Sequence, residues 1–138
     1  MTGIAERPST ARRTFLAAHL TSRQRASLRN HLTGDLEKTR LLIEQLGADM
    51  ESFTASRRDA ATDDEHDPEG PTLAFELSQS SAILAQSIQH LADIDAALYR
   101  MDEGTYGLCK TCGGPIALGR LQVRPQAPLC INCAGRLR

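Results

Sequence analysis

Two close pairs of cysteines constrain this chain more than any other feature. Cys109 and Cys112 form the first pair, Cys130 and Cys133 form the second, and 17 residues separate the pairs. A spacing of two residues within each pair lets two thiolates meet one tetrahedral ion, and the spacing between the pairs lies in the range of four-cysteine zinc sites. The sequence therefore predicts one structural zinc ion held by these four residues.

The residues around the cysteines support this prediction. Gly113 and Gly114 follow the first pair and allow the backbone to curl, so that amides can donate to the sulfurs. Apolar residues are few between residues 104 and 138, so we expect metal binding to contribute folding free energy on the order of 10 kcal/mol. Four thiolates leave no open position for a catalytic zinc, whereas a redox switch that expels the metal on oxidation remains an alternative.

Two runs of regularly spaced apolar residues precede the cysteines. The chain contains no Trp and only 4% aromatic residues, so Leu, Ala and Ile must provide the packing, as in long helices. A capping box from Thr21 to Gln24 predicts the start of the first helix, and Gly104, which suits a left-handed C-terminal position, predicts the end of the second. The apolar positions are separated by three, four or seven residues, a spacing typical of a coiled-coil seam. The first run contains Leu28, Leu32, Leu36, Ile43, Leu46, Met50 and Phe53, with the polar Thr39 at one seam position. The second run contains Leu73, Leu77, Leu84, Ile88, Leu91, Ile94, Leu98 and Met101.

A connection separates the two runs. The first pattern stops at Arg57 and Arg58, and residues 59–72 combine acidic side chains with Pro68, Gly70 and Pro71. Two helices of about 30 to 35 residues joined by a short loop fold back on each other and would extend roughly 45 to 50 Å. We therefore expect a mainly α fold: a flexible basic leader (1–20), a long antiparallel coiled-coil hairpin (21–103) with an acidic tip loop (59–72), and a small four-cysteine zinc finger (104–138).

Charge is segregated along the chain. The formal net charge of -1 and the pI near 6.4 argue against a protein that coats nucleic acid. The segment 59–69 nevertheless gathers Asp59, Asp63, Asp64, Glu65, Asp67 and Glu69 without a basic residue, while the finger carries Arg120, Arg124, Arg136 and Arg138. These arginines could contact phosphates or an acidic protein surface.

Membrane and enzyme functions find no support in the sequence. There is no run of about 18 apolar residues, and the short apolar stretch 15–18 is interrupted by His19, so we expect neither a membrane span nor secretion but a cytoplasmic protein. A Gly-rich phosphate loop and a clustered Ser/His/Asp set are both missing, and the four histidines, including His66 in the acidic segment, look incidental. We expect no enzymatic activity.

The residues around the finger resemble a known family. They are Ile94-Asp95-Ala96-Ala97-Leu98, the stretch 102–107, Pro115-Ile116, Arg120-Leu121, Arg124-Pro125 and the two cysteine pairs. Together they resemble the DksA/TraR family of bacterial RNA polymerase-binding proteins, densely over residues 91–134. The resemblance implies a hairpin that enters the secondary channel of RNA polymerase and modulates initiation, often with guanosine tetraphosphate as co-regulator.

In that family, acidic residues at the hairpin tip act near the catalytic magnesium. The resemblance assigns this role to Asp63, Asp64, Glu65 and Asp67, and it makes Arg120 and Arg124 candidate contacts with polymerase or phosphate. Familiar members carry Asp-x-x-Asp-x-Ala at the tip, whereas Glu69 stands here in place of the Ala. The leading hypothesis is a monomeric, non-enzymatic transcription regulator. The alternative is a zinc-finger DNA-binding protein whose hairpin mediates dimerisation.

Overall fold

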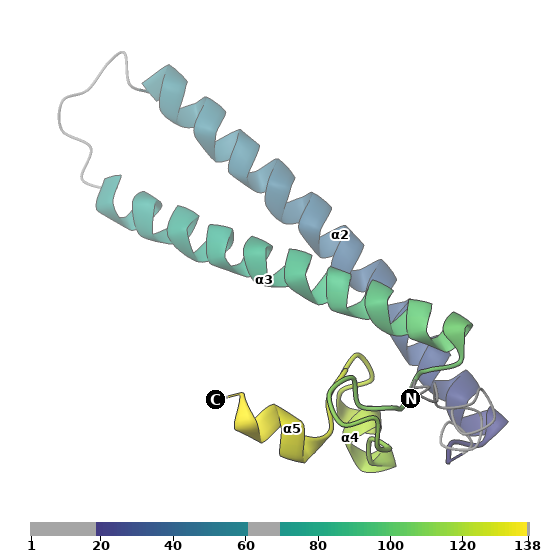
Figure 1. The fold of residues 1–138 in the computed structure, drawn as a ribbon. Coiled ribbons are helices and arrows are strands. Elements are labelled where there is room, and N and C mark those ends of the chain that lie inside the picture. Colours follow the sequence, from purple (N-terminus) through teal and green to yellow (C-terminus); the bar gives the residue numbers. More distant parts are fainter. Residues whose placement is uncertain (1–18, 61–69, 138) are drawn as a thin grey trace, which may run out of the picture. The chain divides into compact units, whose positions relative to one another are not determined.

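The protein is a helical hairpin followed by a compact cysteine-containing segment. A computed structural model describes residues 19–60 and 70–137. Helices α2 (Ser22–Ala60) and α3 (Gly70–Glu103) form the hairpin, and the short helices α4 (Leu118–Val123) and α5 (Ile131–Arg136) follow (Figure 1). Between α3 and α4 the backbone makes one isolated antiparallel bridge, from Leu108 to Pro115. The mainly α fold predicted from the sequence is confirmed.

The predicted capping box starts α2. The backbone N–H of Gln24 donates to Oγ1 of Thr21 at 3.1 Å, and the N–H of Thr21 donates to Oε1 of Gln24 at 2.9 Å. This reciprocal pair satisfies two amide donors near the start of the helix, which have no partner within it. The entry of the chain into the hairpin is thus fixed by local sequence.

A glycine ends α3, as predicted. Gly104 follows the helix with a φ of 77°, a left-handed conformation that glycine adopts without a steric penalty. The N–H of Gly104 donates to the carbonyl of Met101 at 3.3 Å, and the N–H of Thr105 donates to that of Arg100 at 2.9 Å. These bonds close the last turn and direct the chain into the finger.

The helices extend further towards the tip than the sequence pattern indicates. Helix α2 spans 39 residues and includes Asp59 and Ala60, while α3 begins at Gly70. Part of the predicted connection (59–72) is therefore helical, because Pro71 is compatible with a first helical turn and Ala60 is a strong helix former. The tip residues Asp63, Asp64, Glu65 and Asp67 lie outside the described residues.

The chain divides into two compact units. The described residues of the first are 19–35 and 93–137, that is, one end of each hairpin helix together with the finger. In its core, Leu32 and Ile94 from the hairpin and Ile116 and Leu121 from the finger are at most 1% exposed. Burial of four aliphatic side chains stabilises this unit, at roughly 1.5 to 3 kcal/mol for each residue.

The second unit, residues 36–92, is less tightly packed. Among its described residues only Leu36, Thr39 and Ser87 are buried. The prediction that Ile88 belongs to the seam is wrong, because Ile88 is 52% exposed and Ser87 is 8% exposed. Ser87 continues the alternation of three and four residues that connects Leu84, Leu91 and Ile94, so a small polar residue occupies this seam position. None of the described helices contains a stretch both long and apolar enough to cross a membrane.

Candidate metal centre

The first cysteine pair lies on a tight turn. The N–H of Cys109 donates to the carbonyl of Gly114 at 2.8 Å, and the N–H of Gly113 donates back to the carbonyl of Cys109 at 2.9 Å. Gly113 has a φ of 72°, and the N–H of Gly114 donates to Sγ of Cys112 at 3.4 Å. The predicted amide-to-sulfur hydrogen bond is confirmed at Gly114.

The second pair lies at the start of α5. Cys130 occupies the N-cap position and Cys133 lies in the helix, where the N–H of Ala134 donates to the carbonyl of Cys130 at 2.9 Å. The two halves of the finger are joined by a bond from the N–H of Lys110 to the carbonyl of Pro128, also at 2.9 Å. The turn after Cys109 and the start of α5 thus hold the two cysteine pairs opposite each other.

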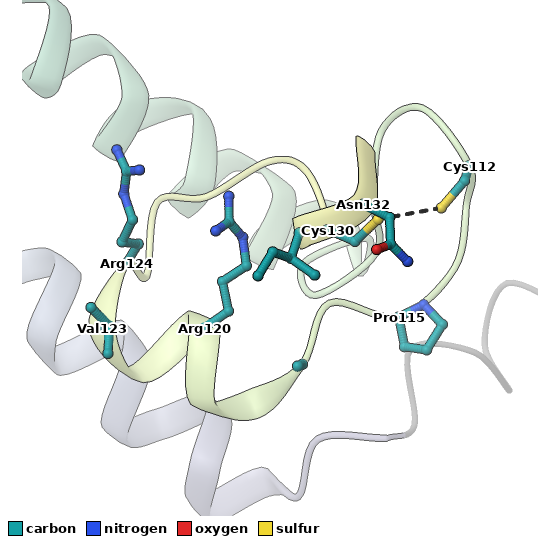
Figure 2. A pocket seen from close by; sticks show the side chains of 9 residues that line it. Cys112, Pro115, Arg120, Val123, Arg124, Cys130 and Asn132 are labelled. Atoms are coloured by element: carbon teal, nitrogen blue, oxygen red, sulfur yellow. Dashed lines mark hydrogen bonds between the residues drawn. The ribbon is translucent and has the colours of Figure 1, made fainter. Parts of the chain in front are cut away.

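The four sulfurs form one cluster. All of them lie within 4.8 Å of one another, and Sγ of Cys112 lies 3.9 Å from Sγ of Cys130 (Figure 2). In a tetrahedral site with zinc–sulfur bonds of about 2.3 Å, the sulfurs are about 3.8 Å apart. The donor set and its dimensions therefore fit zinc, and four sulfurs leave no position for a substrate or a water molecule.

The thiols influence one another strongly. Side-chain hydrogen bonding with Cys130 and then desolvation raise the pKa of Cys133 to about 12. Desolvation also opposes ionisation of Cys109, but hydrogen bonds from the backbone of Cys112, Cys130 and Thr111 outweigh it and lower its pKa to about 6. Four adjacent thiolates need a cation to balance their charge, and a zinc ion supplies it while releasing the remaining protons.

Two polar contacts hold the segment that follows α4, one from within the finger and one from α3. The Tyr106 hydroxyl donates to the carbonyl of Pro125 at 2.8 Å, and Nη2 of Arg100 donates to the carbonyl of Gln126 at 3.3 Å. Desolvation raises the pKa of Tyr106 to about 12, so its hydroxyl remains a donor at neutral pH. Sequence reasoning missed this pair, because only the fold brings residues 100, 106 and 125 together.

The start of the described chain also packs on the finger. Nε2 of His19 donates to the carbonyl of Ile116 at 3.1 Å, and Leu20 is 4% exposed. This packing corrects two predictions from the sequence, a flexible leader that includes residues 19 and 20 and an incidental role for His19. The one available signal was an apolar residue, Leu20, directly before the capping box.

This packing depends on a glycine. Gly107 has a φ of 88°, and a Cβ atom there would lie 2.9 Å from Cε1 of His19 and 3.1 Å from Cδ1 of Leu20. Gly107→Ala is therefore expected to lower the free energy of unfolding of the first unit by about 2 to 3 kcal/mol, through strain and crowding together. Chemical denaturation, followed by circular dichroism on the zinc-loaded protein, measures this loss.

Gly104→Ala is the matched control. Gly104 has a similar φ of 77°, but a Cβ atom there would meet no atom of the described residues within 4 Å. Gly104→Ala should lower the free energy of unfolding only by the cost of the left-handed backbone, about 1 kcal/mol. Equal losses in the two variants would contradict the close packing of residues 19 and 20 on the finger.

Comparison with known proteins assigns the finger. A sequence model of the prokaryotic DksA/TraR C4-type zinc finger matches residues 104–137. The RNA polymerase-binding transcription factor DksA of Caulobacter vibrioides is 41% identical over 46 residues, which are 33% of this chain and 32% of that protein. DksA of Haemophilus influenzae is 45% identical over 40 residues, 29% of this chain and 28% of that protein. Residues 104–137 therefore form a zinc finger of the DksA/TraR C4 type.

The similarity extends beyond the finger in two other comparisons. The uncharacterized protein YteA of Bacillus subtilis is 28% identical over 104 residues, 70% of this chain and 44% of that protein. The structure of transcription factor DksA2 from Pseudomonas aeruginosa matches with a TM-score of 0.68 at 24% identity and covers 90% of this chain and 94% of that one. The second likeness concerns the fold alone, and the matched part spans about a third of the length of the DksA proteins above.

The DksA/TraR finger is of the C4 type and its four cysteines cluster, so the chain takes one structural zinc ion. Of the other predicted site residues, Arg120 and Arg124 lie at α4 and at the residue that follows it. Nε of Arg120 donates to the carbonyl of Leu129 at 2.9 Å, so this arginine also holds the segment before α5. These two arginines therefore lie among the described residues, whereas the tip acids Asp63, Asp64, Glu65 and Asp67 do not.

Proposed function

We propose that this protein is a transcription regulator that binds bacterial RNA polymerase, with its helical hairpin inserted into the secondary channel. One observation carries the proposal: the finger matches proteins named RNA polymerase-binding transcription factor DksA at 41% and 45% identity. The likeness of the fold to DksA2 over 90% of the chain supports it. The finger would serve as a structural base and the hairpin as the inserted element.

The physical properties of the hairpin suit this role. Each helix is about 10 to 12 Å wide with its side chains, so a helix pair can enter a passage that excludes a globular domain. The segment that connects α2 to α3 contains Asp63, Asp64, Glu65 and Asp67. Carboxylates delivered near a catalytic magnesium can perturb the metal and the basic groups around it. The regulator itself then needs no catalytic residue.

DNA binding through the finger, with a dimerising hairpin, is the competing function. It would use the arginines of the finger, of which Arg120 and Arg124 line the same groove, to contact phosphates. The two functions therefore depend on different charges. Polymerase regulation depends on the acids of the tip, whereas DNA retention would depend on arginines.

A retention assay separates the two functions. Immobilised full-length protein is incubated with purified bacterial RNA polymerase, or with duplex DNA, at moderate salt. We expect retention of polymerase in the absence of DNA, and little retention of DNA by the wild type or by a variant with Arg120 and Arg124 replaced by Gln. Retention of DNA but not of polymerase would overturn the proposed function.

A further inference from the structure

A groove on the finger has the features of a protein-binding site. It lies between α4 and α5, beside the zinc ligands Cys112 and Cys130 that line one side of it, and has a volume of about 620 Å³. Pro115, Ala117, Val123 and Ile131 provide apolar surface, and Arg120 and Arg124 line the same groove (Figure 2). Val123 is 80% exposed and Ile131 is 71% exposed, whereas the neighbouring Leu121 is fully buried. These two side chains therefore contribute little to the core and leave an apolar surface open to solvent.

The charges around the groove favour an acidic partner. Residues 104–138 contain no Asp or Glu, so no carboxylate side chain of the finger can neutralise its arginines. The guanidinium of Arg120 is oriented by its bond to the carbonyl of Leu129. For Arg124, no salt bridge or side-chain hydrogen bond occurs within the described part of the chain. Both arginines project to the same side of α4 (Figure 2), where they can receive carboxylates.

The groove is less suited to nucleic acid than to a protein. Single-stranded nucleic acid is commonly bound by bases that stack on exposed aromatic side chains. Tyr106 is the one aromatic residue between positions 104 and 138, and it is 2% exposed. A duplex would need a broad row of cations along its phosphates, but here two guanidinium groups flank an apolar hollow. An aliphatic side chain flanked by carboxylates complements both parts of the surface.

We propose that this groove docks an acidic segment of RNA polymerase and receives one or two of its apolar side chains. The apolar contact with Val123 and Ile131 would supply affinity, and the arginines would select for acidic residues beside the inserted side chain. The inference rests on the proposed function and adds a second contact, on the finger, to the one made by the hairpin. It also gives a common role to the exposed Val123 and to Arg124, whose side chain has no hydrogen-bond or salt-bridge partner among the described residues.

Two substitutions test the groove, and each has a clear expected result. Val123→Asp places a carboxylate on the apolar surface opposite an acidic partner, and Arg124→Gln removes a cation. The affinity of zinc-loaded full-length protein for purified bacterial RNA polymerase is measured by biolayer interferometry. We expect each variant to weaken binding about tenfold or more, as for a central interface residue. The loss for Arg124→Gln should shrink as salt rises, because a charge contact is screened.

Gln122→Asp is the matched control. Gln122 is an exposed residue of α4 that does not line the groove, so this variant adds the same charge one position away. It should bind within about twofold of the wild type, and all three variants should retain one zinc ion. If the wild type binds polymerase and Val123→Asp binds as well as Gln122→Asp, the groove inference is overturned while the proposed function stands. If Arg124→Gln instead loses affinity for DNA and not for polymerase, the partner of the groove is nucleic acid and the groove inference is overturned. If the wild type does not bind polymerase, the proposed function itself is overturned.

Discussion

Cys133→Ser is expected to abolish stable zinc binding and to unfold the finger while much of the hairpin helix remains. The sulfurs of all four cysteines lie within 4.8 Å of one another, and the backbone around them is held by a few bonds such as that from the N–H of Ile116 to the carbonyl of Gly107 at 2.7 Å. Since metal binding to such sites contributes on the order of 10 kcal/mol, the remaining contacts cannot replace it. The expected loss of folding free energy is the largest that any single substitution in this chain should cause.

Zinc content and amide hydrogen exchange measure this effect together. The wild type should contain one zinc ion, and the amides of Cys109, Gly113 and Ile116, which donate to carbonyls within the finger, should be protected. Cys133→Ser should lose the metal and this protection. Thr111→Ser changes an exposed residue between two ligands and should retain both. Protected finger amides in the metal-free variant would contradict a fold held by zinc.

Replacing Asp64 and Asp67 together by Asn is expected to abolish the effect on transcription and leave polymerase binding within about twofold. The change removes two negative charges from the segment between α2 and α3. A unit charge about 4 Å from another contributes on the order of 4 kcal/mol at an effective dielectric constant of about 20. Loss of two such charges near a catalytic magnesium should therefore reduce the regulatory effect tenfold or more. Promoter-specific transcription with purified polymerase measures it.

The control for this prediction removes the same charge elsewhere on the hairpin. Glu51 lies on α2 and Glu76 on α3, and both are exposed. Glu51→Gln combined with Glu76→Gln should leave regulation unchanged. If the Asn variant and this control both lose regulation, the net charge of the protein rather than the tip acts on polymerase. If the Asn variant regulates like the wild type, the tip has no role.

Local sequence predicted those parts of the structure that depend on neighbouring residues. The cysteine spacing predicted the metal cluster, Thr21 and Gln24 the start of α2, and Gly104 the end of α3. Each of these features is decided within a few residues, by ligand spacing, a capping hydrogen bond or a left-handed backbone. The family resemblance stated from the finger residues is likewise confirmed by the match over residues 104–137.

Features that depend on contacts distant in sequence were not predicted. Ile88 was assigned to the seam because it is apolar, but the heptad register places Ser87 there. The contact of His19 with Ile116 spans 97 positions, and no periodic pattern indicates it. The groove lined by Val123 and Ile131 likewise lies between α4 and α5, which only the fold brings together. These features follow from tertiary packing, which a pattern in one sequence does not specify.

Site-specific crosslinking from the tip tests the central claim most directly. A photoreactive amino acid at position 65, beside Asp64, would be activated in the complex of full-length protein with purified bacterial RNA polymerase, and the crosslinked peptides identified by mass spectrometry. Insertion into the secondary channel predicts crosslinks to polymerase segments that surround the catalytic magnesium, with the same probe at position 122 crosslinking only to the outer surface. Crosslinks from position 65 to the outer surface alone, or to DNA, would contradict the account.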